Sequence, residues 1–161
     1  MIQTLFQKLL NKAGKNYTID PEIPSGLFIK NLTKRLIMVF RGYFFLYQKV
    51  FLGKNCNISN KPNILFRKNV TIENNVTIDG YAKNKLIFGD NVKIGAYSLV
   101  TCTSHLSKYG VGLTIGNNSA IGRFTEFGAS GGIEIGNDVI MGSYISFHSE
   151  NHNFLDSSKL I

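Results

Sequence analysis

Three histidines are the residues best suited to chemistry near neutral pH: His105, His148 and His152. An imidazole with an ordinary pKa near ~6.5 can take a proton from a hydroxyl group or bind a metal ion. Two of the three lie close together in the sequence, with Glu150 and Asn151 between them. A carboxylate or an amide in that position can orient an imidazole or contact a bound ligand. The segment that ends at His152 is therefore the first candidate for a site.

Two cysteines, Cys56 and Cys102, have neither the number nor the spacing of a disulfide framework or a metal site. Both fall on positions of the repeat described next, so packing inside the fold is favoured over a role as nucleophile. We expect both thiols to be reduced.

From about residue 46 onward, apolar residues recur every six positions, and three hexapeptides make a unit of eighteen residues. Gly, Asn or Asp often follows the apolar residue, where a tight corner needs a positive φ. Such repeats are typical of a parallel β-helix, in which three short strands form one coil and coils stack roughly 4.8 Å apart. About five coils are predicted, from these triplets: Leu46, Leu52 and Ile58, the weakest; Phe66, Ile72 and Ile78; Phe88, Ile94 and Val100; Ile115, Ile121 and Phe127; Ile135, Met141 and Phe147.

Stacking would gather the repeated apolar residues into columns, and each buried side chain would contribute about 1.5–3 kcal/mol. The residues that exceed eighteen in each coil all fall after the third hexapeptide. Every insertion is therefore predicted at one corner of the prism, and the longest runs over residues 106–114. Loops on one edge of a regular scaffold are where sites are usually built.

The place of each histidine within the six-residue repeat predicts the side or corner of the solenoid on which it lies. His152 ends the third hexapeptide of its coil, on the corner that carries the insertions, and His105 has the same phase two coils earlier. The two would lie about 10 Å apart along the solenoid, too far to share a metal ion within one subunit. His148 follows the inward Phe147 and is predicted to face another way.

Two segments resemble a known family: GLTIGNNSAIG, and after it GASGGIEIGNDVIMGSYISFHSENHNFLD. They resemble the hexapeptide-repeat acyltransferases, and most closely the sugar O-acetyltransferases of polysaccharide biosynthesis. The similarity extends from about residue 28 to the end. It is specific because the repeats, the GG-I-x-IG motif and the SENHNF segment occur together. It implies a left-handed β-helix, a homotrimer, and acetyl-CoA bound as co-substrate between neighbouring subunits.

The resemblance implies acetyl transfer from acetyl-CoA to a saccharide hydroxyl in cell-surface polysaccharide biosynthesis. His152 matches the histidine of the family's HNF-type motif and would be the catalytic base, a role worth about 10²- to 10⁴-fold in rate. Glu150 or a backbone carbonyl would hold the other ring nitrogen. His148 and Asn151 are the expected contacts of the acceptor. No metal is expected, and no residue is assigned to acetyl-CoA.

The first third of the chain differs from the rest in charge and periodicity. Of a net charge of +8, seven come from residues 1–54, which hold nine Lys and Arg against Asp20 and Glu22. Apolar spacing predicts a short amphipathic helix before Gly14 and a second helix over residues 27–47. We divide the chain into a basic helical segment, residues 1–45, and an all-β domain, residues 46–161, which we expect to fold as the left-handed parallel β-helix that the resemblance implies.

The basic segment is predicted to contact an anionic membrane surface peripherally. The alternative is that the second helix caps the β-helix and its lysines face water. Nucleic acid is not an expected partner, because no base-reading motif accompanies the charge. No apolar stretch reaches the roughly 20 residues of a spanning helix, and polar residues interrupt the first apolar positions, so we expect a cytoplasmic chain without a cleaved signal.

Members of the resembling family continue past the HNF segment through further coils. We therefore expect an acyltransferase domain that is incomplete at its C-terminus, with Met141 and Phe147 exposed on an unpaired edge. Two alternatives to acyl transfer stay open. One is a non-catalytic β-helical scaffold, and the other is a zinc-dependent carbonic anhydrase of the γ type. The second would use His105, His148 and His152 across a subunit boundary.

Overall fold

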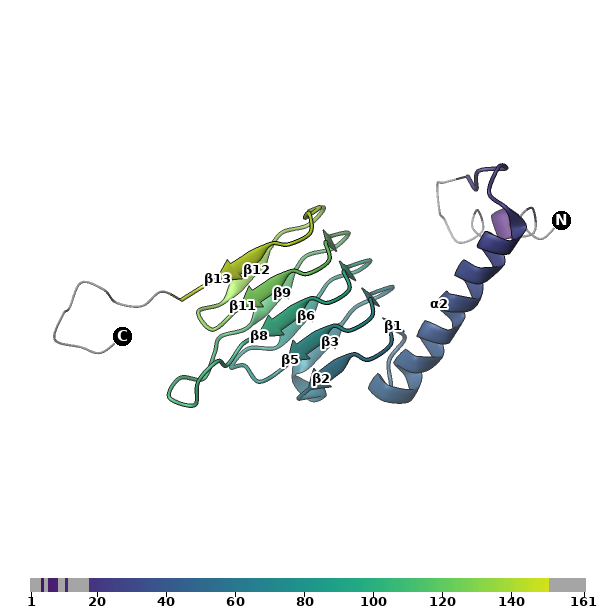
Figure 1. Cartoon of the computed structure of the whole chain (residues 1–161). Helices are drawn as coiled ribbons and strands as arrows, with labels where there is room; N and C mark the ends of the chain where they lie inside the picture. Colours follow the sequence, from purple (N-terminus) through teal and green to yellow (C-terminus); the bar gives the residue numbers. More distant parts are fainter. Residues whose placement is uncertain (1–3, 5, 9–10, 12–17, 151–161) are drawn as a thin grey trace. The chain divides into compact units, whose positions relative to one another are not determined.

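The structure, a computed structural model, describes residues 4, 6–8, 11 and 18–150 (Figure 1). The chain forms two compact units, Met1–Ile37 and Met38–Ile161. The helix α2, Ser25–Leu46, begins in the first unit and ends in the second.

In the first unit, the described residues between Thr4 and Asn11 are helical. The Phe6 ring meets the Phe28 ring of α2 edge to face, with 5.1 Å between the ring centroids. The predicted second helix is confirmed as α2, which ends where Tyr47 adopts a left-handed φ of 54°. No helix in the described part of the chain is long and apolar enough to cross a membrane.

The second unit is a parallel β-solenoid of about four turns, so the predicted β-helix is confirmed. The predicted leading coil is incomplete, because Leu46 ends α2 instead of starting a strand. The elements that follow α2 are β1 (Phe51–Leu52), β2 (Asn57–Ser59), the 3-10 helix η1 (Lys61–Asn63), β3 (Ile64–Phe66), β4 (Thr71–Ile72), β5 (Thr77–Asp79), β6 (Leu86–Phe88), β7 (Lys93–Ile94), β8 (Leu99–Thr101), β9 (Leu113–Ile115), β10 (Ala120–Ile121), β11 (Glu126–Gly128), β12 (Ile133–Ile135) and β13 (Ser146–His148).

The strands form three sheets, with the orders β1-β4-β7-β10, β13-β11-β8-β5-β2 and β12-β9-β6-β3. Strands of the same phase pair in register, so equivalent residues of successive coils lie opposite one another. Phe88 pairs with Phe66 and with Ile115, and Phe127 pairs with Val100 and with Phe147. The predicted columns of apolar side chains are therefore confirmed by the register.

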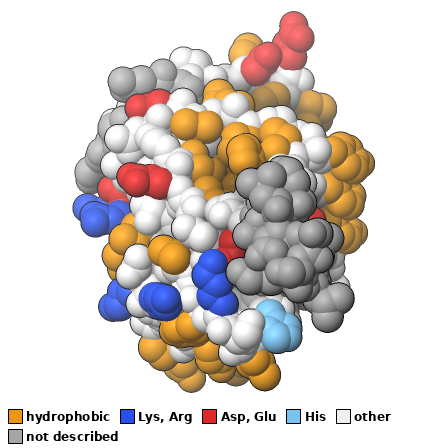
Figure 2. Space-filling model, turned by 90° about the vertical axis from the view of Figure 1, so that its left-hand side faces the viewer, with side chains coloured by type: hydrophobic (Ala, Val, Ile, Leu, Met, Phe, Trp, Pro, Cys, Tyr) orange, Lys and Arg blue, Asp and Glu red, His pale blue; other side chains and the backbone are white. Residues whose placement is uncertain are grey.

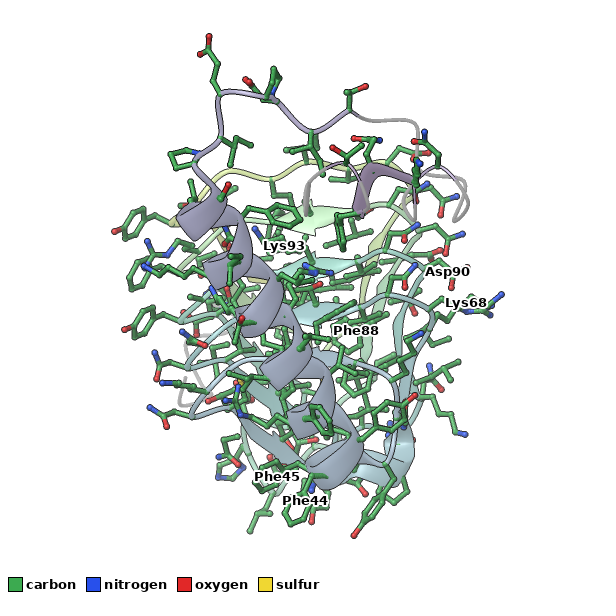
Figure 3. All side chains as sticks on the ribbon, turned by 90° about the vertical axis from the view of Figure 1, so that its right-hand side faces the viewer. Phe44, Phe45, Lys68, Phe88, Asp90 and Lys93 are labelled. Atoms are coloured by element: carbon green, nitrogen blue, oxygen red, sulfur yellow. The ribbon has the colours of Figure 1, made fainter. Side chains whose placement is uncertain are left out.

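The interior of the solenoid is filled mainly by apolar side chains. Phe88, labelled in Figure 3, is completely buried, and its ring stacks on that of Phe66 with 5.2 Å between centroids. The second inward position is also buried in several hexapeptides, as at Val76, Val92 and Ser98. Side chains of the last described coil are less covered: Phe147 is 42% exposed, and Figure 2 shows hydrophobic side chains over this end.

One corner of the solenoid carries a ladder of amide side chains. Its members have φ between 55° and 59°, a region that Asn and Asp enter more readily than most residues. Each side-chain N–H₂ donates to the next coil, at 2.8–3.1 Å. The preceding residues add a second set of bonds, as where the Lys68 N–H donates to the Asp90 carboxylate at 3.0 Å (Figure 3). The members of this asparagine ladder are Asn69, Asn91, Asn118 and Asp138.

A second corner changes its residue type part-way along the solenoid. Asn55 and Asn75 occupy it first, and three aromatic residues of the later coils follow, all with positive φ: Tyr97, Phe124 and Tyr144. A side chain other than Gly in a sparsely populated backbone region costs about 1–3 kcal/mol. The two stacking contacts among the three rings return only about 0.5–1.5 kcal/mol each. These aromatic residues therefore offset only part of the strain that they carry.

The third corner holds the insertions, as predicted. Each falls between a strand of the β13-β11-β8-β5-β2 sheet and the next strand of the β12-β9-β6-β3 sheet. The longest, between β8 and β9, spans residues 102–112. The outward face of β8, β11 and β13 is thus bordered by the aromatic residues on one side and by this insertion on the other.

The columns predict where the fold is sensitive to substitution. Phe88→Ala should lower the free energy of unfolding by about 3–5 kcal/mol, because it leaves a cavity in the middle of a column. Leu65→Ala, on the outward side of β3 where Leu65 is 39% exposed, is the matched control and should cost far less. Urea unfolding followed by circular dichroism measures both values. Equal losses in the two variants would contradict the assignment of inward and outward positions.

Candidate functional site

A groove of about 660 Å³ lies on the outward face of β8, β11 and β13 and under the long insertion. Its floor is the sheet, and its rim is the 103–110 loop and the residues after β13. The outward strand residues Thr101, Glu126 and Gly128 and the imidazoles of His105 and His148 all line this groove. The lining residues are Thr101, Ser104, His105, Ser107, Lys108, Glu126, Gly128, Ser130, His148, Ser149 and Glu150.

The 103–110 loop is anchored at both ends to the solenoid. The Thr103 hydroxyl donates to the carbonyl of Tyr81 at 2.7 Å and accepts from the Gly110 N–H at 3.1 Å. A Cβ added at Gly110 would lie 1.6 Å from the Cys102 carbonyl oxygen, so only glycine fits at this closure. The Val111 N–H then donates to the Ser130 carbonyl at 2.9 Å, which returns the chain to the next coil. The loop is therefore a built part of the rim.

His148 lies on the floor of the groove, at the end of β13. Its Nε2 is 2.8 Å from the hydroxyl oxygen of Ser146, two residues earlier on the same face of the strand. The ring covers Gly128 of β11, where an added Cβ would lie 2.7 Å from Nδ1. The orientation of this imidazole thus depends on one neighbouring hydroxyl and on the missing side chain at position 128.

His105 lies on the rim, within the loop. The Ser107 N–H donates to its Nδ1 at 3.1 Å, and the Ser107 hydroxyl oxygen lies 2.8 Å from the same nitrogen. Because Nδ1 accepts from the backbone, Nε2 carries the proton in the neutral ring. Nearby, the Lys108 ammonium forms an ion pair with the Glu150 carboxylate. This pair ties the loop to the chain that follows β13.

The structure brings together part of the predicted site. His148 and Glu150 both line the groove, and His105 lines it as well, although repeat phase predicted that His105 and His148 face different ways. Glu150, the expected partner of an imidazole, is paired with Lys108. His152, the predicted base, and Asn151 lie outside the described residues.

Sequence reasoning missed Lys108 and Glu126, which line the groove, and Ser146, whose hydroxyl lies beside Nε2 of His148. Two of them carried a usable signal, because alternation along a strand places Glu126 and Ser146 outward, beside the inward Phe127 and Phe147. Lys108 lies in an insertion without a repeat, so its pairing depends on the loop conformation. No spacing rule could have found it.

The two cysteines pack inside the solenoid or against it. Cys102 is completely buried, and burial, with a smaller effect of the Asp79 carboxylate, raises the pKa of its thiol to about 12. Cys56 is half-buried, and burial raises its pKa as well. Since the thiolate is the reactive form, both thiols are poorly suited to act as nucleophiles at neutral pH.

Among the residues that the structure describes, no three or more His, Cys, Asp and Glu side chains are arranged to hold a metal ion. Comparisons with protein-family models, with curated proteins and with solved structures found no match to this chain. The parallel solenoid agrees with the resembling acyltransferases at the level of the fold. Its left-handedness and its membership of that family stay predictions.

The contact between His148 and Gly128 gives a sharp test of the groove. Gly128→Ala should turn the imidazole away from Ser146, because the new methyl group occupies the position beside Nδ1. Nitrogen NMR of the histidine rings should show a changed environment for His148. Gly136→Ala is the matched control, since an added Cβ there meets nothing within 4 Å. Unchanged His148 signals in the Gly128 variant would show that the ring does not lie where described.

Proposed function

We propose that this protein transfers an acetyl group from acetyl-CoA to a hydroxyl of a saccharide, in the groove on β8, β11 and β13. The observation that carries the proposal is the convergence of His105, His148 and the Lys108–Glu150 pair on one open groove. Imidazoles beside a polar, accessible surface suit proton transfer from a weakly acidic hydroxyl. The acceptor would belong to cell-surface polysaccharide biosynthesis, as the sequence resemblance implies.

In the proposed reaction, the acceptor oxygen attacks the carbonyl carbon of the thioester while an imidazole takes the hydroxyl proton. The tetrahedral intermediate collapses, the C–S bond breaks, and the thiolate of CoA leaves and is protonated by the imidazolium. The proposal keeps His152 as the base. Within the described groove, His148, Glu150 and the Ser146 hydroxyl contact and orient the acceptor.

Several features of the groove support these roles. Its floor is sheet, so His148 is held by a strand that pairs along its whole length with β11. A site on a strand is positioned more tightly than one on a free loop. Opposite charges on the rim, at Lys108 and Glu150, offer a donor and an acceptor to a polyhydroxylated ligand. The proposal includes a homotrimer with acetyl-CoA between subunits, because the resemblance implies both.

The proposal is tested by measuring free CoA thiol after the full chain is mixed with acetyl-CoA and a panel of saccharides. His152→Ala should reduce transfer by about 10²- to 10⁴-fold. His148→Ala should reduce it less and raise the KM for the acceptor. Lys93→Gln removes an exposed ion pair with Glu73 on the outward side of β7, outside the groove, and should leave transfer unchanged.

Two results would decide against this function. Absence of acetyl-CoA binding in calorimetry would favour the non-catalytic scaffold. Activity that requires stoichiometric zinc and hydrates CO₂ would favour the carbonic anhydrase. Full transfer by His152→Ala would remove that residue from the mechanism while leaving the groove in place.

We also propose that α2 holds the protein at an anionic membrane surface. Large apolar side chains are exposed on this helix, including Phe40 and Phe44, each 76% exposed; Figure 3 labels Phe44 and Phe45 near its end. Lys30, Lys34 and Arg35 lie on the same helix. Apolar side chains interleaved with basic ones are typical of helices that bind the interface of an anionic bilayer.

Vesicle sedimentation tests the membrane contact. The full chain should bind vesicles that contain phosphatidylglycerol, and binding should weaken as salt is added. The double variant Phe40→Ser and Phe44→Ser should bind about tenfold less, since it removes two apolar side chains from the contact. Tyr81→Ser, at a residue 53% exposed outside the helix, is the control and should bind normally. Equal binding to phosphatidylcholine vesicles would contradict the role of charge.

A further inference from the structure

Three aromatic side chains form a continuous stack along the second corner of the solenoid. The rings of Tyr97 and Phe124 are 5.0 Å apart at their centroids, those of Phe124 and Tyr144 are 4.9 Å apart, and both pairs are within 6° of parallel. They stay open to solvent, with exposed fractions of 50%, 39% and 78% in chain order. We call Tyr97, Phe124 and Tyr144 the aromatic ladder.

Stability does not explain the residue types of the aromatic ladder. All three residues have φ between 55° and 62°, where Asn is tolerated much better than Phe or Tyr. The same corner is closed in earlier coils by Asn55 and Asn75, whose side chains bond to each other at 3.3 Å. Asparagine would therefore serve the fold here as well. Strained and exposed aromatic residues that the fold does not need point to a surface for binding.

A cation accompanies the ladder. The guanidinium carbon of Arg123 lies 5.4 Å from the ring centroid of Phe124 and 6.0 Å from that of Tyr97. The ion pairs Lys93–Glu73 and Lys108–Glu150 do not include Arg123. A guanidinium that lies over aromatic rings keeps donors available for a carboxylate or phosphate of a ligand. The ladder therefore combines ring surface, phenol hydroxyls and positive charge.

The ladder borders the same sheet face as the groove. Tyr97, Phe124 and Tyr144 each lie two residues before the first residue of β8, β11 and β13, respectively. The groove begins on these strands, with Glu126 at the start of β11 and His148 at the end of β13. At about 3.3 Å per residue, a strand places Tyr144 roughly 13 Å from His148 along the backbone. A ligand on the ladder can therefore reach the groove.

We propose that the aromatic ladder and Arg123 bind an extended acidic saccharide chain that lies along the solenoid axis. Its biological role, as the acceptor chain whose hydroxyl enters the groove, rests on the proposed function. The rings repeat about every 5 Å, a spacing comparable with the length of one pyranose residue. Successive sugars can therefore repeat the same contacts, with C–H groups against the ring edges and hydroxyls against the phenols of Tyr97 and Tyr144.

The repetition of one aromatic ring per coil favours a saccharide chain over the adenine of acetyl-CoA as the ligand. A single base needs one platform, whereas this ladder repeats one ring in each of three successive coils, and the rings stack on one another. Arg123, beside the middle of the ladder, selects sugars that carry a carboxylate.

Calorimetry with oligogalacturonate tests the proposal on the full chain in the absence of acetyl-CoA. The triple variant Tyr97→Asn, Phe124→Asn and Tyr144→Asn should lower affinity by about tenfold or more. Asn is the residue that the fold uses at this corner, so the variant should keep or raise the melting temperature. Tyr43→Gln, at a residue of α2 that is 51% exposed, is the matched control and should bind like the wild type.

Further measurements distinguish acidic saccharides from neutral saccharides and from CoA as the ligand of the ladder. Arg123→Gln should weaken binding of oligogalacturonate and leave the weak binding of neutral malto-oligosaccharides unchanged. Equal affinity of the wild type for acidic and neutral chains would overturn the acidic assignment. Unchanged saccharide affinity in the triple variant, or loss of CoA binding in its place, would overturn the ladder as a saccharide site.

The outcomes also separate this inference from the proposed function. Release of CoA thiol with a monosaccharide acceptor, without any binding of oligogalacturonate, would leave acyl transfer intact and contradict the ladder. Binding that depends on the ladder, without thiol release, would support the ladder and contradict acyl transfer.

Discussion

The whole structure depends on the stacking of one coil on the next in register. A coil of three two- or three-residue strands has no interior that it can enclose alone, so each inward side chain completes its burial on the coils before and after it. A shift of one residue in any sheet would turn the inward column outward. The register from Phe66 through Phe88 to Ile115 shows this constraint held over successive coils. Every outward group, including those of the groove, inherits its position from that register.

The corners are where the same constraint leaves room for function. A corner must reach a left-handed backbone conformation, and the asparagine ladder satisfies it with residues that tolerate positive φ and bond to one another. The aromatic ladder meets the same demand at a higher conformational cost. Since both ladders close their coils, the outward chemistry at a corner does not depend on the core. Binding surface can therefore be built there without disturbing the columns.

The sequence predicts the features of this structure that repeat along the chain, and it fails for those that depend on the conformation of a single loop or side chain. The hexapeptide period predicted the columns and the corner of the insertions, because burial repeats with the chain. It misplaced Leu46, which is apolar at the expected phase and is indeed buried, but in the last turn of α2. The pairing of Lys108 with Glu150 and the position of His148 over Gly128 follow from loop and ring conformations that no period encodes. His152 could be proposed only from resemblance.

The groove combines a floor of paired strands with a rim that carries one exposed ion pair, and the two differ in how firmly they are held. The strand that carries His148 pairs with β11 in register, and its displacement would disturb the column of Val100, Phe127 and Phe147. By contrast, the lysine and carboxylate side chains of the Lys108–Glu150 pair are 64% and 34% exposed, and an ion pair at such a surface contributes only about 0–1 kcal/mol. The rim can therefore exchange this pair for contacts with a charged ligand at small cost, while the floor keeps the imidazole of His148 in place. If the groove acts as proposed, it would hold His148 in position before a ligand arrives and adapt its edge to the ligand afterwards.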